Sequence, residues 1–105
     1  MSGYDPGLGA SVGLFSGRFF VSASTANDPL WGTEHVFTDS IHGDFVSWGI
    51  RLINDTANDV EYSFDGTNVH GVLLGSEDLM FEGRREAKIF LRSAAGGDAV
   101  RVSAW

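Results

Sequence analysis

Residues 60–68 read VEYSFDGTN, and this stretch decides the fold class. Its valine, tyrosine and phenylalanine alternate with polar residues, and a period of two is the pattern of a strand with one buried face. The strand stops at Asp65-Gly66, a dipeptide that favours a tight hairpin turn. We therefore predict a strand here that turns back into a partner strand over residues 69–74.

The preceding apolar stretch, residues 45–53, reads FVSWGIRLI and also alternates. One face of this predicted strand carries Val46, Trp48, Ile50 and Leu52. The other face carries small or polar residues, as expected for a strand that is buried on one side only. We therefore expect Trp48, like Phe64 of the next strand, to lie in the hydrophobic core.

Further short runs of β-forming residues are separated by turn residues along the rest of the chain. The runs cover residues 18–24, 35–38, 79–81, 87–92 and 99–105. We expect residues 94–98 to close a hairpin between the last two runs. Roughly six to eight short strands at this spacing, with no long helix, predict an all-β protein. The predicted fold is an antiparallel β-sandwich, jelly-roll-like, or a small barrel.

The first 17 residues differ from the rest, because they are rich in glycine and show no helical or strand period. Glycine-rich segments lose much conformational entropy when they become ordered, so such a segment is mobile or is ordered only against a neighbour. We predict a glycine-rich N-terminal arm over residues 1–17 and a single β domain over residues 18–105. A chain of 105 residues fits one domain with a thin core.

The chain carries 14 acidic and 7 basic residues, which gives a formal net charge of -7. A surface of this sign repels phosphate backbones and anionic lipid headgroups, so neither nucleic acid nor a membrane is an expected partner. The absence of cysteine excludes cysteine-rich zinc sites and suits synthesis in a reducing cytoplasm. The first residues lack the pattern of a signal peptide, and no run approaches the roughly 20 apolar residues of a membrane span.

Two patterns with cofactor or metal chemistry have simpler explanations. Residues 7–13, GLGASVG, come close to a dinucleotide fingerprint, but the last glycine is one place too far along and no strand precedes it. The residues with metal-ligand chemistry are His35, His42, His70, Glu34 and Asp44. No histidine stands two places from another, and histidines beside glycine and aspartate are more often turn residues. No cofactor and no metal site are predicted.

Catalytic arrangements are equally weak, so we predict that the chain is not an enzyme. The serine and histidine pairs that can be drawn are Ser40 with His42 and Ser47 with His70. No G-x-S-x-G elbow accompanies them. Glu61 and Asp65 lie on one polar strand face, where solvation explains them better than acid-base catalysis does. The acidic loop at residues 54–59 offers oxygen ligands for a weakly bound calcium ion, but turn formation explains the same residues.

Aromatic and large apolar residues outside the predicted core faces indicate contacts with other proteins. In a small chain, surplus apolar residues more often mark a subunit interface than a ligand pocket. The interface candidates are Tyr4, Leu8, Leu14, Phe15, Phe19, Trp31, Phe90 and Trp105. We expect a homo-oligomer.

The stretch Leu52–Ser93 resembles a recurrent pattern in small virion structural proteins of tailed bacteriophages. In that pattern a strand ends in an Asn-rich loop, and a second strand reads like VEYSFDG at residues 60–66. A later strand returns like AKIFLR at residues 87–92. The resemblance implies a β-sandwich deployed in many copies on a capsid, or at a neck or tail, with no catalytic residues to carry over.

The leading hypothesis is therefore a capsid decoration, or cement, subunit that binds the major capsid protein or other virion proteins. Its place would be the virion, after synthesis in the host cytoplasm. A neck or tail structural protein is the nearest alternative. A carbohydrate-binding or receptor-binding module that uses Trp31 or Trp105 against sugar rings is the second class of function. A hydrolase that depends on His42 or His70 comes third.

Overall fold

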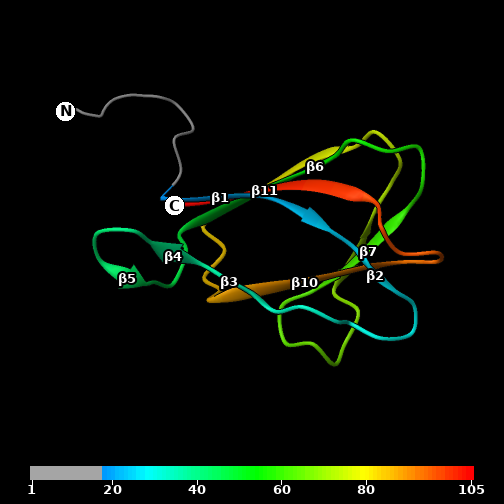
Figure 1. Cartoon of the computed structure of the whole chain (residues 1–105). Coiled ribbons are helices and arrows are strands. Elements are labelled where there is room, and N and C mark those ends of the chain that lie inside the picture. The colour runs from blue at the N-terminus through cyan, green and yellow to red at the C-terminus, as the bar shows by residue number, and fades with distance from the viewer. Residues whose placement is uncertain (1–17) are drawn as a thin grey trace.

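The computed structural model describes residues 18–105, and every regular element in that part of the chain is a β-strand (Figure 1). The strands are β1 (Phe19–Ser24), β2 (Ala26–Asn27), β3 (His35–Val36), β4 (Thr38–Asp39), β5 (Gly43–Asp44), β6 (Gly49–Asn54), β7 (Val60–Ser63), β8 (Gly71–Leu73), β9 (Asp78–Glu82), β10 (Lys88–Ser93) and β11 (Ala99–Ala104). The predicted arm, residues 1–17, lies outside the described residues.

The strands form two main sheets that enclose the core (Figure 1). The first sheet has the order β1-β11-β6-β9, and the second has the order β2-β10-β7-β8, with β3 also paired to β10. The antiparallel pairs β7·β8, β6·β9, β3·β10 and β1·β11 are nested one inside the next along the sequence. This nesting describes one long hairpin rolled into two sheets, which is the jelly-roll form of a β-sandwich. The predicted all-β sandwich is confirmed.

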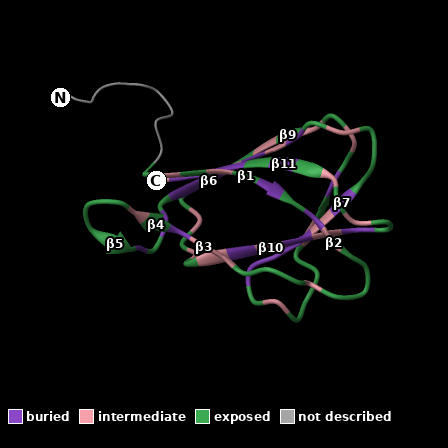
Figure 2. Cartoon of the chain, viewed as in Figure 1, coloured by how far each residue is buried: buried purple, intermediate pink, exposed green. Residues whose placement is uncertain are grey.

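The core lies between the two sheets, whose strands carry most of the buried residues (Figure 2). Fully buried aliphatic residues come from both sheets: Ile50, Leu52, Val100 and Val102 from the first, and Val60, Leu73, Ile89 and Leu91 from the second. Burying a side chain of this kind stabilises the fold by about 1.5–3 kcal/mol. The rings of Phe64 and Phe81 join the sheets edge to face, with centroids 5.9 Å apart. The predicted burial of Phe64 is confirmed.

The hairpin predicted at Asp65-Gly66 is also confirmed, because β7 pairs with β8 in antiparallel register. Asp65 organises the turn: its Oδ1 accepts the N–H groups of Thr67 and Asn68, at 2.8 and 2.9 Å. These bonds favour the ionised carboxylate and hold the pKa of Asp65 well below its usual range. Gly66 supplies the positive φ of 76° that the turn requires.

The predicted core position of Trp48 is wrong, because the alternation over residues 45–53 breaks at Gly49. Trp48 is 60% exposed. The N–H groups of Trp48 and Gly49 both donate to the carbonyl oxygen of Trp105, at 2.6 and 3.2 Å. Two residues opposite one constitute a β-bulge, and the extra residue reverses which side chains point inward. Ile50 therefore faces the core, whereas Trp48 faces solvent.

The predicted hairpin over residues 94–98 is wrong as well, although the chain does turn there. Gly96 and Gly97 adopt the positive φ angles of 73° and 74° that tight turns use. Strand β10 pairs with β7 in the second sheet, however, and β11 pairs with β1 and β6 in the first. The turn therefore carries the chain from one sheet to the other.

Candidate protein-binding surface

The outer face of the first sheet carries large exposed apolar side chains at both of its edges. Cross-strand register aligns Phe20 of β1 with Ser103, then Arg51, then Met80 of β9. Phe20 is 65% exposed and Met80 is 41% exposed. Their sequence neighbours point into the core, so these side chains point away from it. The row therefore places an exposed aromatic ring and an exposed thioether at the two edges of the outer sheet face, with the buried Ser103 and the partly exposed Arg51 between them.

The bulge adds two tryptophans to this surface. The indole of Trp105 lies directly over Gly49, and the space between them admits no side chain, because a Cβ on Gly49 would overlap the ring. Trp48, beside the same bulge, is stacked under the guanidinium of Arg85, which lies 3.8 Å from the ring centroid. Bulges commonly re-aim side chains at functional surfaces. We call Phe20, Trp48, Met80 and Trp105 the aromatic face.

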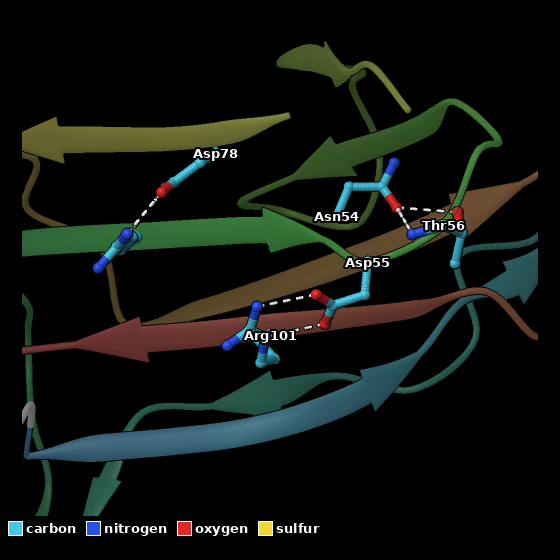
Figure 3. A network of polar contacts seen from close by, with 6 residues as sticks. Asn54, Asp55, Thr56, Asp78 and Arg101 are labelled. Atoms are coloured by element: carbon cyan, nitrogen blue, oxygen red, sulfur yellow. Dashed lines mark hydrogen bonds and ion pairs between the residues drawn. The ribbon is translucent and has the colours of Figure 1, made fainter. Parts of the chain in front are cut away.

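Two ion pairs cross this surface and neutralise its arginines (Figure 3). Arg101 of β11 donates to both carboxylate oxygens of Asp55, each at 2.8 Å. The Nε of Arg51 on β6 donates to Asp78 of β9 at 2.9 Å. These bonds lower the pKa values of Asp55 and Asp78 below their ordinary range, since hydrogen bonding from the guanidinium favours the carboxylate. Each of these two pairs is neutral, whereas the chain as a whole carries a formal charge of -7.

The composition of the aromatic face suits protein contacts. Aromatic residues, methionine and arginine are the residue types enriched at protein interfaces, and aromatic anchors provide much of the binding energy. Exposed ion pairs add at most about 1 kcal/mol each, so they set orientation more than affinity. A surface of this kind can bind another protein without a reactive group.

The interface candidates predicted from the sequence are scattered over the domain. Trp105 lies on the aromatic face, whereas Phe19 packs at the core edge against Phe37, with centroids 5.3 Å apart. Trp31 and Phe90 lie with the second sheet: the guanidinium of Arg92 stacks on Trp31 at 4.0 Å, and Lys88 lies above Phe90. Tyr4, Leu8, Leu14 and Phe15 lie outside the described residues.

Sequence reasoning missed Phe20, Trp48 and Met80 as surface residues. The alternation of side chains along a strand predicts the exposure of two of them, Phe20 and Met80. In residues 19–21 and in residues 79–81 three large apolar residues follow one another, so the middle one must point away from its neighbours. Trp48 had no such signal, because the extra residue of a bulge leaves no mark in an alternating pattern.

The three histidines lie in separate places. His35 of β3 pairs with Ile89, and partial burial lowers its pKa because the charged form is less well solvated. The Nδ1 of His42 lies 3.1 Å from Asp39 in the β4–β5 hairpin. The Nδ1 of His70 accepts the N–H of Phe64 at 3.0 Å. Within residues 18–105 no group of three or more histidine and acidic side chains is arranged to hold a metal ion.

One of the two serine candidates, Ser47, has a structural role. The hydroxyl of Ser47 is fully buried, donates to the carbonyl of Arg84 at 2.6 Å and accepts the N–H of Glu86 at 3.0 Å. This hydroxyl joins the loop before β6 to the loop before β10. Ser40 lies in the exposed turn between β4 and β5.

An acidic depression lies on the second sheet. It has a volume of about 320 Å³, and its lining includes Asp28, Asp59 and Glu61. Two of these carboxylates are already engaged, because the Nε of Arg92 lies 2.6 Å from Glu61 and 3.4 Å from Asp28. The depression is therefore an ion-pair network open to solvent.

Residues 18–105 contain no helix that is long and apolar enough to cross a membrane. No protein-family model, curated protein or solved structure matches the chain.

Proposed function

We propose that the chain is a non-enzymatic structural protein of a tailed-bacteriophage virion, which binds the shell of major capsid protein as a decoration subunit. The observation that carries this proposal is the aromatic face, a sheet surface on which Phe20, Trp48 and Met80 are exposed and Trp105 is partly buried. The capsid as partner comes from the sequence resemblance over Leu52–Ser93.

Two further observations support the proposal. The two ion pairs neutralise Asp55 and Asp78, so these carboxylates add little repulsion when another protein approaches the aromatic face. The jelly-roll form is common among viral capsid domains, and this analogy of fold agrees with the proposed role without deciding it.

Co-sedimentation of the full chain with empty capsids of the phage that encodes it tests the proposal. Trp48→Ala and Met80→Lys should each weaken binding at least about tenfold, because truncating or charging a central interface residue typically removes more than about 1 kcal/mol. Val72→Lys is the matched control: Val72 is about as exposed as Met80, at 46% and 41%, but it lies on the second sheet.

The expected result is capsid binding that the two aromatic-face variants lose and the control retains. Binding to purified necks or tails instead of capsids would move the role to that part of the virion. The proposal fails if the chain binds none of these assemblies, or if Trp48→Ala and Met80→Lys bind capsids as tightly as the unchanged chain.

A glycan-binding module is the second candidate, and the exposed indole of Trp48 favours it. Sugar rings stack on exposed tryptophan, and jelly rolls also occur among lectins. A guanidinium stacks on each ring, Arg85 on Trp48 and Arg92 on Trp31, but Trp31 is only partly exposed and is therefore the weaker candidate. Tryptophan fluorescence during a glycan titration distinguishes the two functions, since a flat response with Trp48 intact excludes glycan binding by this ring.

A further inference from the structure

Strand β1 is the edge of the first sheet, and the backbone groups on its outer side have no partner strand among residues 18–105. Thr25, directly after β1, donates its N–H to the carbonyl oxygen of Asp98 at 3.0 Å. In an antiparallel pair every second residue bonds the same neighbour, so the odd-numbered residues of β1 bond β11. The N–H and C=O groups of Phe20, Ser22 and Ser24 therefore point away from the sheet.

This edge lacks the features that usually prevent strands from pairing between molecules. Natural edge strands are protected by charged side chains, proline, bulges or short length. The six residues of β1, FFVSAS, contain none of these. The opposite edge, β9, has Asp78 and Glu82 at its ends, and the edge strand β8 of the second sheet is only three residues long.

We propose that two copies of the chain pair through β1, antiparallel and about a two-fold axis, so that their first sheets join into one continuous sheet. Directly opposed side chains lie on the same face of a sheet, so an even-numbered residue of one copy must lie opposite an even-numbered residue of the other. Centring the axis on Val21 satisfies this condition and uses the whole strand. Phe20 then exchanges hydrogen bonds with Ser22 of the second copy, and Arg18 exchanges them with Ser24.

The side chains fit the same register. Phe19 and Val21 are only partly buried, although both pack against the core. In the paired sheet Val21 meets Val21 of the second copy and Phe19 meets Ala23, so the exposed parts of both side chains become covered. On the outer face the two Phe20 rings become diagonal neighbours at about 7–8 Å, within the reach of aromatic side chains.

The expected interface is small but sufficient for specific association. Two hydrogen bonds in each of four pairs give about eight, and interfaces carry about one hydrogen bond per 100–200 Å². The corresponding area, about 800–1,600 Å², overlaps the lower part of the range for specific complexes. The absence of charge along β1 matters here, because elsewhere two copies of net charge -7 repel each other.

Sedimentation equilibrium of the full chain over a range of concentrations tests this pairing, together with hydrogen exchange at single amides. Ser22→Pro removes an N–H that points away from the sheet and has no partner strand among residues 18–105, at an edge position where proline is tolerated. Ser22→Lys places two like charges beside the axis. Each variant should raise the dissociation constant of the dimer at least about tenfold, because each change occurs twice in the interface. Met80→Lys on β9 adds the same charge at the far edge and should leave the dimer intact.

The proposal expects a concentration-dependent dimer in which the amides of Phe20, Ser22 and Ser24 gain protection as the dimer forms. A monomer at all concentrations overturns it, and so does a dimer that both Ser22 variants retain. Protection of the three amides in a species of monomer mass also overturns it, because another segment of the same chain would then cover the edge. Capsid binding is a separate readout, so the proposed function and this pairing can fail independently.

Discussion

The side chain of Asn54 ties two loops to the end of β6, and replacing it with alanine should destabilise the fold strongly. Asn54 is 2% exposed. Its Nδ2 donates to the carbonyl oxygens of Asn58 at 2.7 Å and Leu74 at 3.1 Å. Its Oδ1 accepts the N–H of Thr56 at 2.9 Å and the hydroxyl of the same residue at 2.8 Å (Figure 3). One carboxamide thus satisfies groups from residues 54–58 and from the loop after β8.

The size of the effect follows from these four bonds. A hydrogen bond contributes a net of about 0.5–1.5 kcal/mol to stability, so the loss of four should lower the free energy of unfolding of Asn54→Ala by about 2–6 kcal/mol. The lower end of this range applies if water can hydrogen-bond the backbone groups that lose the Asn54 side chain. Domains of this size have a total stability of about 5–15 kcal/mol, so the loss is a large part of the whole.

Urea unfolding followed by tryptophan fluorescence measures the change. Asn58→Ala is the matched control, because the Asn58 side chain donates only one exposed bond, to Asp98 at 2.9 Å, and its loss should cost less than about 1 kcal/mol. Asn54→Asp tests the donor bonds separately from the acceptor bonds. It keeps the accepting Oδ1 but replaces the donating Nδ2 with an oxygen that faces two carbonyl oxygens. The ionised carboxylate repels these carbonyls, so the substitution should destabilise the fold more at neutral pH than at acidic pH. The reasoning is refuted if Asn54→Ala unfolds within about 0.5 kcal/mol of the unchanged chain.

Two other predictions concern the bulge and the pH dependence of stability. Gly49→Ala places a Cβ against the Trp105 ring, so it should destabilise the fold by about 1–3 kcal/mol and change tryptophan emission. Adding Trp105→Ala should make that substitution tolerable, and an unchanged emission spectrum in Gly49→Ala would contradict the contact. Burial lowers the pKa of His35 below 6.5 in the folded chain, so the unfolded chain binds a proton at His35 more readily than the folded chain does. The free energy of unfolding should therefore fall as the pH drops below 6.5. His35→Gln should flatten the decline between about pH 6.5 and pH 5 in unfolding curves, and an identical slope in both proteins would exclude His35 as its source.

The parts of the fold that follow from neighbouring residues were predictable from the sequence. The strand at residues 60–63 and its turn at Asp65-Gly66 are encoded within nine residues, so alternation and turn chemistry suffice. Strand partners are a different matter, because β11 pairs with β1 at the other end of the described chain. The Gly96-Gly97 turn has the same local conformation whether the chain returns beside β10 or crosses to the other sheet, so the sequence could not separate the two.

The candidate site was less predictable than the fold. Phe20 follows from the parity of β1, but only once the inward face of that strand is known. The exposure of Trp48 depends on a shared hydrogen bond to Trp105, and that residue is far along the chain. A bulge is a property of two paired strands, so a single strand's pattern carries no sign of it.

The nested order of the strands sets the order of events when the chain folds. The outermost pair joins Phe19 to Ala104, so the first sheet cannot close until a loop of almost the whole described chain has been brought together. Closing such a loop costs more entropy than forming a local hairpin, and proteins dominated by distant pairings fold in milliseconds to seconds. On the ribosome, β1 leaves the exit tunnel early and must wait for β11, its partner in the finished sheet. During that interval both sides of an uncharged six-residue strand are open, and unpaired edges of this kind are where a folding chain is prone to aggregate.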